Sequence, residues 1–559
     1  MNKYVFPCAI LVAMLAAGSV ASPSESDLPA TDGEALARWQ AMRFGMFIHW
    51  GPVSLKGTEI GWSRKGPRRG RSDTSTGHIP MAEYDTLYQR FNPVAFDADE
   101  WVRIARDAGM QYMVFTSKHH DGFSMFHTEQ SEYSIEHSPF RRDVCQELAD
   151  ACHRAGLGLG WYYSPRDWYH PDFATDHHSR YIAFYLGQLR ELCTHYGRLD
   201  ILWFDGLDSP RELWGDTPGE SFRLIRSLQP HIVLNNRGGL PGDFDTPEQR
   251  VGTFNNRRPW ETCMTLCRQW AWKPDDKMKS LEECIRTLAT CVGGDGNLLF
   301  NVGPMPSGAI EPRQVERLRE MGAWITRHGE SIYGTRGGPF TPCRLGASTH
   351  RGDTVYVHAF VWDADRFVLP AIDRRVVSAK LLSGGGVHMT QDAESIVLTV
   401  PENDRDPIDT VVVLELDGDA GSVRPLPISQ SLTFGKRVRV SNVYQNVQHY
   451  AGASAVDGDG HTRWATDAGT HAAWIEIDLG AEATFTNVMI DEAIEQRIQS
   501  FELQVRRGDG WHTIHRGATV GRNWTQSFAS VTARYVRLNI LDAVKGPTIW
   551  EIEVHPGKR

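Results

Sequence analysis

Three acidic residues in the middle of the chain could act as a catalytic pair. Asp205 closes the apolar run 199–205 and precedes Gly206, so it should lie at the C-terminal end of a buried strand. Glu248 and Glu261 lie in the polar stretches that follow. Hydrolysis of a glycosidic bond uses two carboxyl groups, one as nucleophile and the other as acid and then base. Asp205 fits the first role, and Glu248 or Glu261 fits the second, unless each glutamate is only a surface acid or half of an ion pair.

Aromatic, basic and amide side chains mark the ends of the other predicted strands. The candidate strands span 43–50, 112–116, 157–163, 199–205, 232–235 and 298–302. Their ends carry His49, Lys118, His119, His120, Trp161, Tyr162, Tyr163, Trp203, Asn235 and Arg237. Because the carboxyl ends of parallel strands in a barrel surround one mouth, these side chains should converge on a single polar cavity. Imidazole, phenol and indole groups suit the hydroxyls and the apolar face of a sugar.

The histidines also allow a metal site as a rival hypothesis. Neighbouring side chains on a strand point to opposite faces, so His119 and His120 are not expected to bind one ion together. His49, one histidine of that pair and Asp205 could form a His/carboxylate site. The rival function would be that of a metallohydrolase.

Composition and the N-terminus limit the possible functions. The chain has 559 residues, 41% of them hydrophobic, and a net charge of −10. This length allows two or three domains, and the acidic balance is not that of a nucleic-acid-binding protein. The apolar run 5–17 and the small residues at 19–21 predict a signal peptide over 1–21, and hence export to the periplasm or the cell exterior. No later segment is long and apolar enough to span a membrane.

Strand and helix patterns alternate over residues 30–335, which predicts a β/α (TIM-like) barrel. A doubly wound open sheet is the structural alternative, but no G-x-G-x-x-G motif follows an early strand. Short alternating runs over 336–424 predict a small antiparallel β domain, and a stretch rich in Gly, Ser and Pro follows. Residues 430–557 are again all-β. The nine cysteines show no zinc-ligand spacing, and their disulfide pairing stays open.

The strand ends resemble those of the α-L-fucosidases of glycoside hydrolase family 29. The matching stretches are 43–51, 116–123, 161–164, 203–206 and 296–304, in this order along the chain. The resemblance implies a retaining exo-α-L-fucosidase, on a barrel followed by a small β-sandwich, that needs no catalytic cofactor. Its partners would be fucosylated oligosaccharides or glycoproteins. A barrel glycosidase of a different sugar and a non-catalytic carbohydrate-binding protein are the alternatives.

The resemblance also assigns roles to individual residues. The nucleophile position falls on Asp205 and the acid/base position on Glu248, with Glu261 in reserve. The fucose-binding positions fall on His49, His119, His120, Tyr163, Trp203, Arg237 and Trp270. Of these, Trp270 stands where an aromatic ring packs on the fucose methyl group. The loop 59–64 departs from some family members, so contacts by Glu59 or Trp62 are not assigned.

The C-terminal segment resembles discoidin domains, also called coagulation-factor 5/8 type C domains, which include carbohydrate-binding module family 32. The stretches 455–465, 474–480 and 535–538 carry this resemblance. It implies a β-sandwich with a structural Ca²⁺ site at Asp457, Asp459 and Thr462, whose oxygens suit a hard cation. The alternative is a turn without metal, and sugar binding by this domain stays open.

Overall fold

A computed structural model describes residues 31–69, 77–207, 211–362, 365–428, 431–458, 462–494 and 496–556. The predicted signal peptide over 1–21 lies outside these residues. In the described part of the chain, no helix has the length and apolar character needed to cross a membrane.

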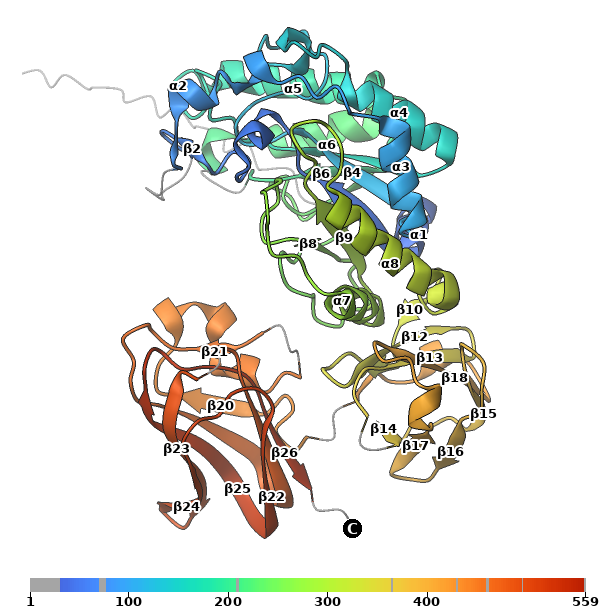
Figure 1. Ribbon diagram of the computed structural model, residues 1–559, viewed down its shortest axis with the longest axis vertical. Helices are drawn as coiled ribbons and strands as arrows, with labels where there is room; N and C mark the ends of the chain where they lie inside the picture. Colours follow the sequence, from blue (N-terminus) through green and yellow to red (C-terminus); the bar gives the residue numbers. More distant parts are fainter. Residues whose placement is uncertain are drawn as a thin grey trace, which may run out of the picture.

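Seven parallel strands form the centre of the N-terminal domain (Figure 1). They are β1 (Phe44–Ile48), β4 (Tyr112–Lys118), β5 (Gly158–Tyr163), β6 (Ile201–Phe204), β7 (Val233–Leu234), β8 (Glu261–Thr265) and β9 (Asn297–Val302). Their order in the sheet is β7-β6-β5-β4-β1-β9-β8. Every residue in these strands is buried, as expected when helices cover one face and the barrel interior the other. The sequence pattern missed β8, because Glu-Thr-Cys-Met-Thr does not look like a buried strand.

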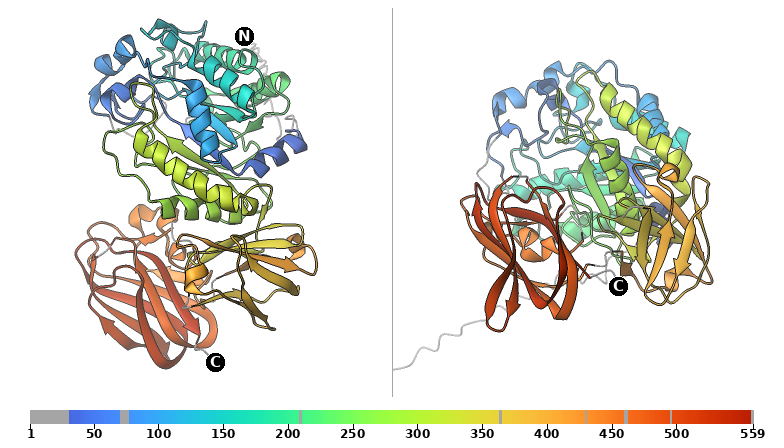
Figure 2. Two further views of the ribbon diagram at one scale, coloured as in Figure 1. Left: turned by 45° about the vertical axis from the view of Figure 1, so that its right-hand side comes forward. Right: turned by 60° about the horizontal axis from the view of Figure 1, so that its bottom comes forward.

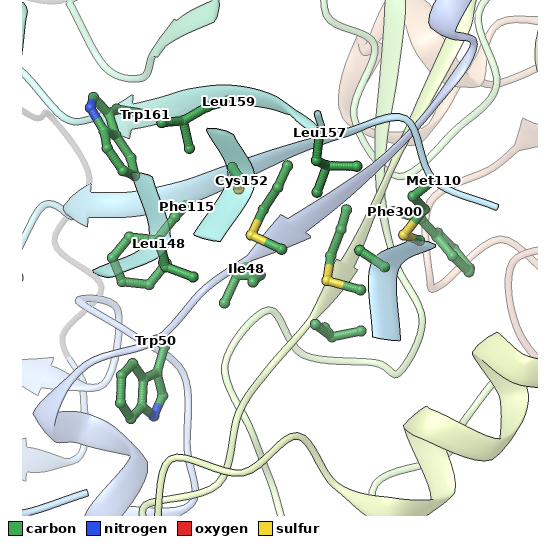
Figure 3. Packing of buried hydrophobic residues seen from close by; sticks show 14 of the residues in the cluster. Ile48, Trp50, Met110, Phe115, Leu148, Cys152, Leu157, Leu159, Trp161 and Phe300 are labelled. Carbon is green, nitrogen blue, oxygen red and sulfur yellow. The ribbon is translucent and has the colours of Figure 1, made fainter. Parts of the chain in front are cut away.

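Helices surround this sheet. They are α1 (Gly33–Met42), α2 (Met81–Tyr84), α3 (Ala98–Asp107), α4 (Val144–Ala155), α5 (His178–Thr194), α6 (Thr217–Leu228), α7 (Leu281–Gly293) and α8 (Pro312–His328). A two-stranded sheet, β2 (Arg64–Lys65) with β3 (Ile79–Pro80), lies in the loops after β1. The α4 residues Leu148 and Cys152 pack with Phe115 and Leu159 of the neighbouring strands (Figure 3). This packing holds the strand ends at fixed positions, which is what a catalytic site needs.

The gap between β7 and β8 is filled by an irregular stretch, residues 243–249, which we call the closing segment. Isolated bridges join Asn235 to Phe244 on one side, and Glu248 to Cys263 on the other. The amide of Cys263 also donates to the carbonyl of Pro247 at 3.0 Å. The segment thus takes the place of a barrel strand, but Pro247 lacks an N–H and cannot support a regular ladder.

Two β domains follow and lie side by side at one end of the barrel (Figure 2). The first has a five-stranded sheet of β10 (Arg336–Gly337), β12 (Gly346–Arg351), β13 (Thr354–Ala359), β18 (Thr410–Leu416) and β15 (Val376–Leu381). Its other strands are β14 (Arg366–Pro370), β17 (Ser395–Thr399) and β16 (His388–Gln391), and the pair β11 (Phe340–Thr341) with β19 (Leu426–Pro427).

The C-terminal domain is a sandwich of antiparallel strands, of which β22 and β25 are the longest with 20 residues each. They are β20 (Arg437–Val440), β21 (Trp464–Ala465), β22 (Ala473–Glu492), β23 (Ile498–Arg507), β24 (Gly510–Gly517), β25 (Trp524–Ala543) and β26 (Thr548–Pro556). The pairing of β22 with β25 shifts register between Asp478 and Ala483. The guanidinium of Arg344, in the first β domain, contacts the Glu553 carboxylate of β26 at 2.5 Å, which joins the two β domains.

Candidate active site

A pocket of about 190 Å³ lies at the C-terminal ends of the barrel strands. It is lined by Phe47, His49, Trp62, His119, His120, Tyr162, Arg166, Trp203, Asp205, Arg237, Glu248, Cys263 and Trp270. The predicted residues His49, His119, His120, Trp203, Asp205, Arg237, Glu248 and Trp270 are all in this set. Two predicted residues, Tyr163 and Glu261, are not.

Asp205 follows β6 directly and projects into the pocket. Its Oδ2 accepts a hydrogen bond from the Tyr162 hydroxyl at 2.9 Å, and its Oδ1 accepts one from Nη1 of Arg237 at 3.2 Å. Burial by itself raises the pKa of Asp205, but the charge of Arg237 and these hydrogen bonds outweigh it and hold the pKa below its ordinary value. Asp205 is therefore ionised at neutral pH, the state that a nucleophile needs.

Arg237 connects the two carboxylates of the pocket. The same Nη1 that contacts Asp205 donates to Oε2 of Glu248 at 2.8 Å. The two contacted oxygens are therefore at most about 6 Å apart, which agrees with the ~5–5.5 Å carboxyl separation of retaining glycosidases. Nε of Arg237 donates to the hydroxyl of Thr246 at 2.8 Å, and the guanidinium lies 4.7 Å from the centre of the Trp203 ring. These contacts fix the guanidinium between both acids.

Glu248 and Asp205 differ in exposure. The Glu248 side chain is 43% exposed, whereas that of Asp205 is 23% exposed. Glu248 lies on the closing segment, and the next residue, Gln249, has a φ of 54°. This left-handed conformation is uncommon for a residue with a side chain and turns the chain sharply. The turn leaves the Glu248 carboxyl at the rim of the pocket.

The two adjacent histidines both reach the pocket, against the expectation that they point to opposite faces. β4 ends at Lys118, so His119 and His120 lie in the turn after it, where strand alternation no longer applies. Their ring centres are 4.3 Å apart. Nδ1 of His120 is 2.6 Å from the Ser164 hydroxyl, and Nε2 of His120 is 3.5 Å from Oδ2 of Asp205.

His49 and Trp270 form another wall of the pocket, with ring centres 4.8 Å apart. Nδ1 of His49 is 2.7 Å from the side-chain oxygen of Asn301, whose amide nitrogen in turn donates to the carbonyl of Trp270. Burial lowers the pKa of His49 to about 4. Burial and the adjacent His120 likewise lower the pKa of His119. Both imidazoles are neutral near pH 7, so each offers one donor and one acceptor to a ligand.

The loop after β1 supports this wall. The carboxylate of Glu59 accepts the backbone N–H groups of Trp270 and Ala271, at 2.9 and 3.1 Å. Trp62, from the same loop, lines the pocket itself. The sequence left both residues unassigned because their loop departs from some family members.

Tyr163 does not line the pocket, contrary to the prediction; its neighbour Tyr162 does. Tyr163 is fully buried on the helix side of β5, where its hydroxyl donates to Gln188 and its ring lies 4.8 Å from Nζ of Lys118. Tyr162 points to the barrel interior and contacts Asp205 instead. Adjacent residues on a strand alternate between faces, and the run of three aromatic residues did not indicate which one faces inward.

Glu261 is at the start of β8, enclosed in the barrel interior and with no exposed surface. Its carboxylate accepts the indole N–H of Trp203 at 3.1 Å and the hydroxyl of Tyr112. Burial raises the pKa of Glu261 to about 7. A carboxyl that neither lines the pocket nor reaches solvent cannot protonate a leaving group, so the structure separates Glu261 from Glu248.

The metal hypothesis for the barrel mouth gains no ligand cluster. Within the described residues, no group of three or more His, Cys, Asp or Glu side chains could hold a metal ion. A site on His49, His119 and Asp205 therefore lacks the arrangement that it requires. In the C-terminal domain the hydroxyl of Thr462 donates to the carboxylate of Asp457 at 2.8 Å, and Asp459 lies outside the described residues.

Comparison with known proteins identifies the family. The family model described as Alpha-L-fucosidase matches residues 12–330, more than half of the chain. The chain belongs to the α-L-fucosidase family. The F5/8 type C domain model matches residues 438–553. The resemblances seen in the sequence are thus confirmed for both parts, and so is the predicted α-L-fucosidase activity.

Relatives of this α-L-fucosidase cover different shares of the chain. Plasma alpha-L-fucosidase of Homo sapiens is 32% identical over 332 residues, which cover 54% of this chain and 70% of the human one. A GH29 alpha-L-fucosidase of Bacteroides thetaiotaomicron, trapped as a covalent intermediate in a Glu-to-Gln mutant, is 25% identical with a TM-score of 0.63. It covers 70% of this chain and 98% of its own.

The fucosidase of Vibrio sp. strain EJY3 matches 95% of this chain and 99% of its own, with a TM-score of 0.67 and 22% identity. This likeness extends over the barrel and both β domains. It confirms the predicted architecture of a TIM-like barrel followed by β-sandwich domains.

Proposed function

We propose that Asp205 and Glu248 of this α-L-fucosidase release terminal α-L-fucose by a two-step displacement that retains the anomeric configuration. The observation that carries this proposal is the shared hydrogen-bond donor, Nη1 of Arg237, which contacts both carboxylates. Through this one atom, an ionised acid and a more exposed acid contact the same cation at the pocket.

In the first step, a carboxylate oxygen of Asp205 attacks the anomeric carbon of fucose. The bond from that carbon to the leaving oxygen breaks, and protonated Glu248 gives its proton to that oxygen. The product is an ester between Asp205 and fucose. Only the ionised form of Asp205 can attack the anomeric carbon. The lowered pKa of Asp205 keeps it in this form before the reaction.

In the second step, ionised Glu248 takes a proton from water while the water oxygen attacks the anomeric carbon. The ester bond breaks, Asp205 regains its negative charge, and fucose leaves with its original configuration. The exposure of Glu248 supports this role, because the same carboxyl must meet both the leaving group and the incoming water.

The other pocket residues suit a single sugar ring. Neutral His49 and His119 can donate to or accept from sugar hydroxyls, and Trp270 offers an apolar surface for the methyl group at C5 of fucose. We take the fucosylated substrate to be an oligosaccharide or a glycoprotein glycan that presents fucose at its end. The trapped covalent intermediate of the Bacteroides relative supports the same chemistry here.

Turnover of a nitrophenyl α-L-fucoside tests the nucleophile. Asp205→Ala should abolish turnover while the fold is kept, and near wild-type turnover by this variant would overturn the assignment. Glu248→Ala should regain activity when azide is added, because azide can attack the ester without help from a base. Rescue of Glu261→Ala instead of Glu248→Ala would transfer the acid/base role to Glu261.

We also propose a structural Ca²⁺ site at Asp457 and Thr462, predicted together with Asp459, which lies outside the described residues. The buried carboxylate of Glu551 lies close by and accepts the backbone N–H of Gly458 at 3.1 Å. Two carboxylates and a hydroxyl form a set of oxygen ligands that fits this ion, which would cross-link the loop to β26. Chelation should lower the unfolding temperature of the C-terminal domain and leave turnover of the nitrophenyl fucoside unchanged. Equal unfolding temperatures with and without chelator would contradict the site.

The proposed location is the periplasm or the cell exterior, from the signal-peptide pattern over 1–21. N-terminal sequencing of the mature protein tests this proposal. We expect the mature chain to start at Ser22. A mature chain that still carries the apolar run 5–17 would contradict cleavage of a signal peptide.

A further inference from the structure

One face of the C-terminal sandwich carries arginine and aromatic side chains in adjacent rows. Directly paired residues of neighbouring strands share a face. Three such rows cross the sheet: Arg437–Asp478–Tyr535, Arg439–Glu476–Arg537–Gln504 and Trp474–Asn539–Glu502–Arg516. The residues between these positions, including Ile475, Ile477, Val536 and Leu538, are buried in the core. We call this outer surface of β20, β22, β25, β23 and β24 the arginine face.

The acids of the arginine face are covered, whereas its arginines are exposed. The three ion pairs are Arg439 with Glu476, Arg516 with Glu502 and Arg534 with Asp478. In the same order, the carboxylate side chains of Glu476, Glu502 and Asp478 are 12, 12 and 21% exposed. Their arginine partners are 78, 76 and 45% exposed. Positive charge is therefore what this face presents to solvent, although the whole chain has a net charge of −10.

Two further arginines on the face, Arg506 and Arg537, form no ion pair within the described residues. Both lie on aromatic rings instead. The guanidinium of Arg537 is 4.7 Å from the ring centre of Trp474 and 5.2 Å from that of Trp511. The guanidinium of Arg506 is 5.5 Å from the ring of Tyr535. Stacking on aromatic rings orients a guanidinium and leaves its N–H edge available for another partner.

The two arginines are close to each other. Gln504 of β23 pairs directly with Arg537 of β25, and Arg506 is two residues further along β23. This diagonal relation corresponds to about 7–8 Å between the backbones. Trp511 pairs with Arg506 across the next strand boundary and also contacts Arg537. The nearest acid to Arg537 is Glu476, which lies opposite it on β22 and attracts it but forms its ion pair with Arg439. Two guanidiniums that form no ion pair in the described part of the chain and three partly exposed aromatic rings thus lie within one small area.

We propose that the arginine face binds polysaccharides that carry sulfate or carboxylate groups. Guanidinium groups bind such oxyanions through two parallel hydrogen bonds, and aromatic rings pack on the apolar faces of sugars. The domain lies apart from the barrel strands that hold Asp205 (Figure 1). The face would therefore hold an anionic glycan near the enzyme and raise the local concentration of fucosylated chains, without contacting the reacting bond.

The test measures binding of the full chain to three polymers: dextran sulfate, polygalacturonate and neutral dextran. The variant Arg506→Gln with Arg537→Gln removes the two arginines of the face that form no ion pair in the described residues. Its affinity for the charged polymer should fall by about tenfold to a hundredfold, which corresponds to a total loss of about 1.4 to 2.8 kcal/mol of binding free energy. Wild-type binding should weaken as salt is added, because exposed charges are screened.

A matched control is Arg103→Gln with Arg319→Gln, on α3 and α8. It makes the same change in net charge at side chains that are 52 and 62% exposed. Its affinity should stay within about twofold of wild type, as expected for exposed charges outside a binding site. All variants should keep wild-type turnover of a nitrophenyl α-L-fucoside, because none of these residues lines the pocket.

Preference for dextran sulfate or for polygalacturonate identifies the anionic group, and either preference supports the proposal. Three outcomes overturn it: no binding to either charged polymer, equal binding to neutral dextran, and equal losses in the double variant and its control. These outcomes do not bear on the roles of Asp205 and Glu248, which the fucoside assay reports separately.

Discussion

Two glutamates on adjacent parts of the barrel wall have opposite surroundings. Glu248 lies on the irregular closing segment, is 43% exposed and shares Arg237 with the nucleophile. Glu261 lies at the start of the regular strand β8, is fully buried and accepts hydrogen bonds from the neutral groups of Trp203 and Tyr112. A regular inward-facing strand position encloses its side chain, whereas an irregular segment can bring a carboxyl to the rim of a pocket.

The buried glutamate still bears on the site through Trp203. Glu261 holds the indole N–H of Trp203, and the ring of Trp203 lies beneath the guanidinium of Arg237. In the proposed mechanism Glu261 is thus a positioning residue, and Glu248 is a catalytic one. Variants at these two positions and at their neighbours test this distinction.

The largest effect is expected from Glu248→Gln. It should lower kcat/KM for a fucosyl disaccharide by about 10²–10⁴-fold, because the variant cannot protonate the leaving oxygen. The loss should be smaller for a nitrophenyl fucoside, whose leaving group needs little help from an acid. Kinetics on both substrates measure the difference. Equal losses on the two substrates would contradict the acid role of Glu248.

The second-largest effect is expected on the free energy of unfolding, through the titration of Glu261. Its pKa is about 7 in the folded chain and near 4.5 in the unfolded chain, so the folded state binds more protons between these values. The free energy of unfolding should therefore fall as pH rises from about 4.5 to about 7, by roughly 3 kcal/mol from this group. Glu261→Gln should remove this dependence. Urea unfolding at pH 5 and pH 8 measures it, and identical pH slopes in wild type and variant would contradict the assignment.

A smaller effect is expected from Arg237→Lys. Lysine keeps the charge but cannot contact Asp205, Glu248 and Thr246 together through one planar group. We expect kcat to fall by about 10–100-fold, as for the loss of one or two charged hydrogen bonds. The control is Arg198→Lys, whose partner Asp200 lies at the opposite end of β6. A drop in kcat of the same size in the control would show a general effect on the barrel.

The smallest effect is expected from Glu59→Gln, a third glutamate that is removed from the reacting atoms. In wild type, the two carboxylate oxygens of Glu59 accept the backbone N–H groups of Trp270 and Ala271. In the variant, an NH₂ group replaces one of these oxygens and cannot accept, so the chain around Trp270 is held less firmly. KM for the nitrophenyl fucoside should rise about fivefold, the effect of about 1 kcal/mol, with kcat little changed. An effect on kcat alone would place Glu59 in the chemistry and not in the wall.

Much of the pocket could be predicted from the sequence because most of its residues follow regular buried strands. His49 and Asp205 come directly after such strands, Arg237 follows β7 after two residues, and the topology then brings the three together. The choice between Tyr162 and Tyr163 failed because both neighbours on β5 are buried, so hydrophobicity does not reveal which side faces inward. The closing segment could not be predicted, because Pro247 and the polar residues around it show no strand pattern in the sequence. In the structure these residues pair with their neighbours only through isolated bridges.

The contact of Arg237 with both acids has a consequence for the charge balance of the reaction. In the proposed mechanism, Asp205 is negative and Glu248 carries the proton before the first step, whereas in the ester intermediate Asp205 is neutral and Glu248 is negative. One guanidinium therefore neutralises one carboxylate in either state, through the same Nη1 atom. The net charge of the three side chains is the same in both half-reactions, so no counter-ion has to enter or leave the pocket between them.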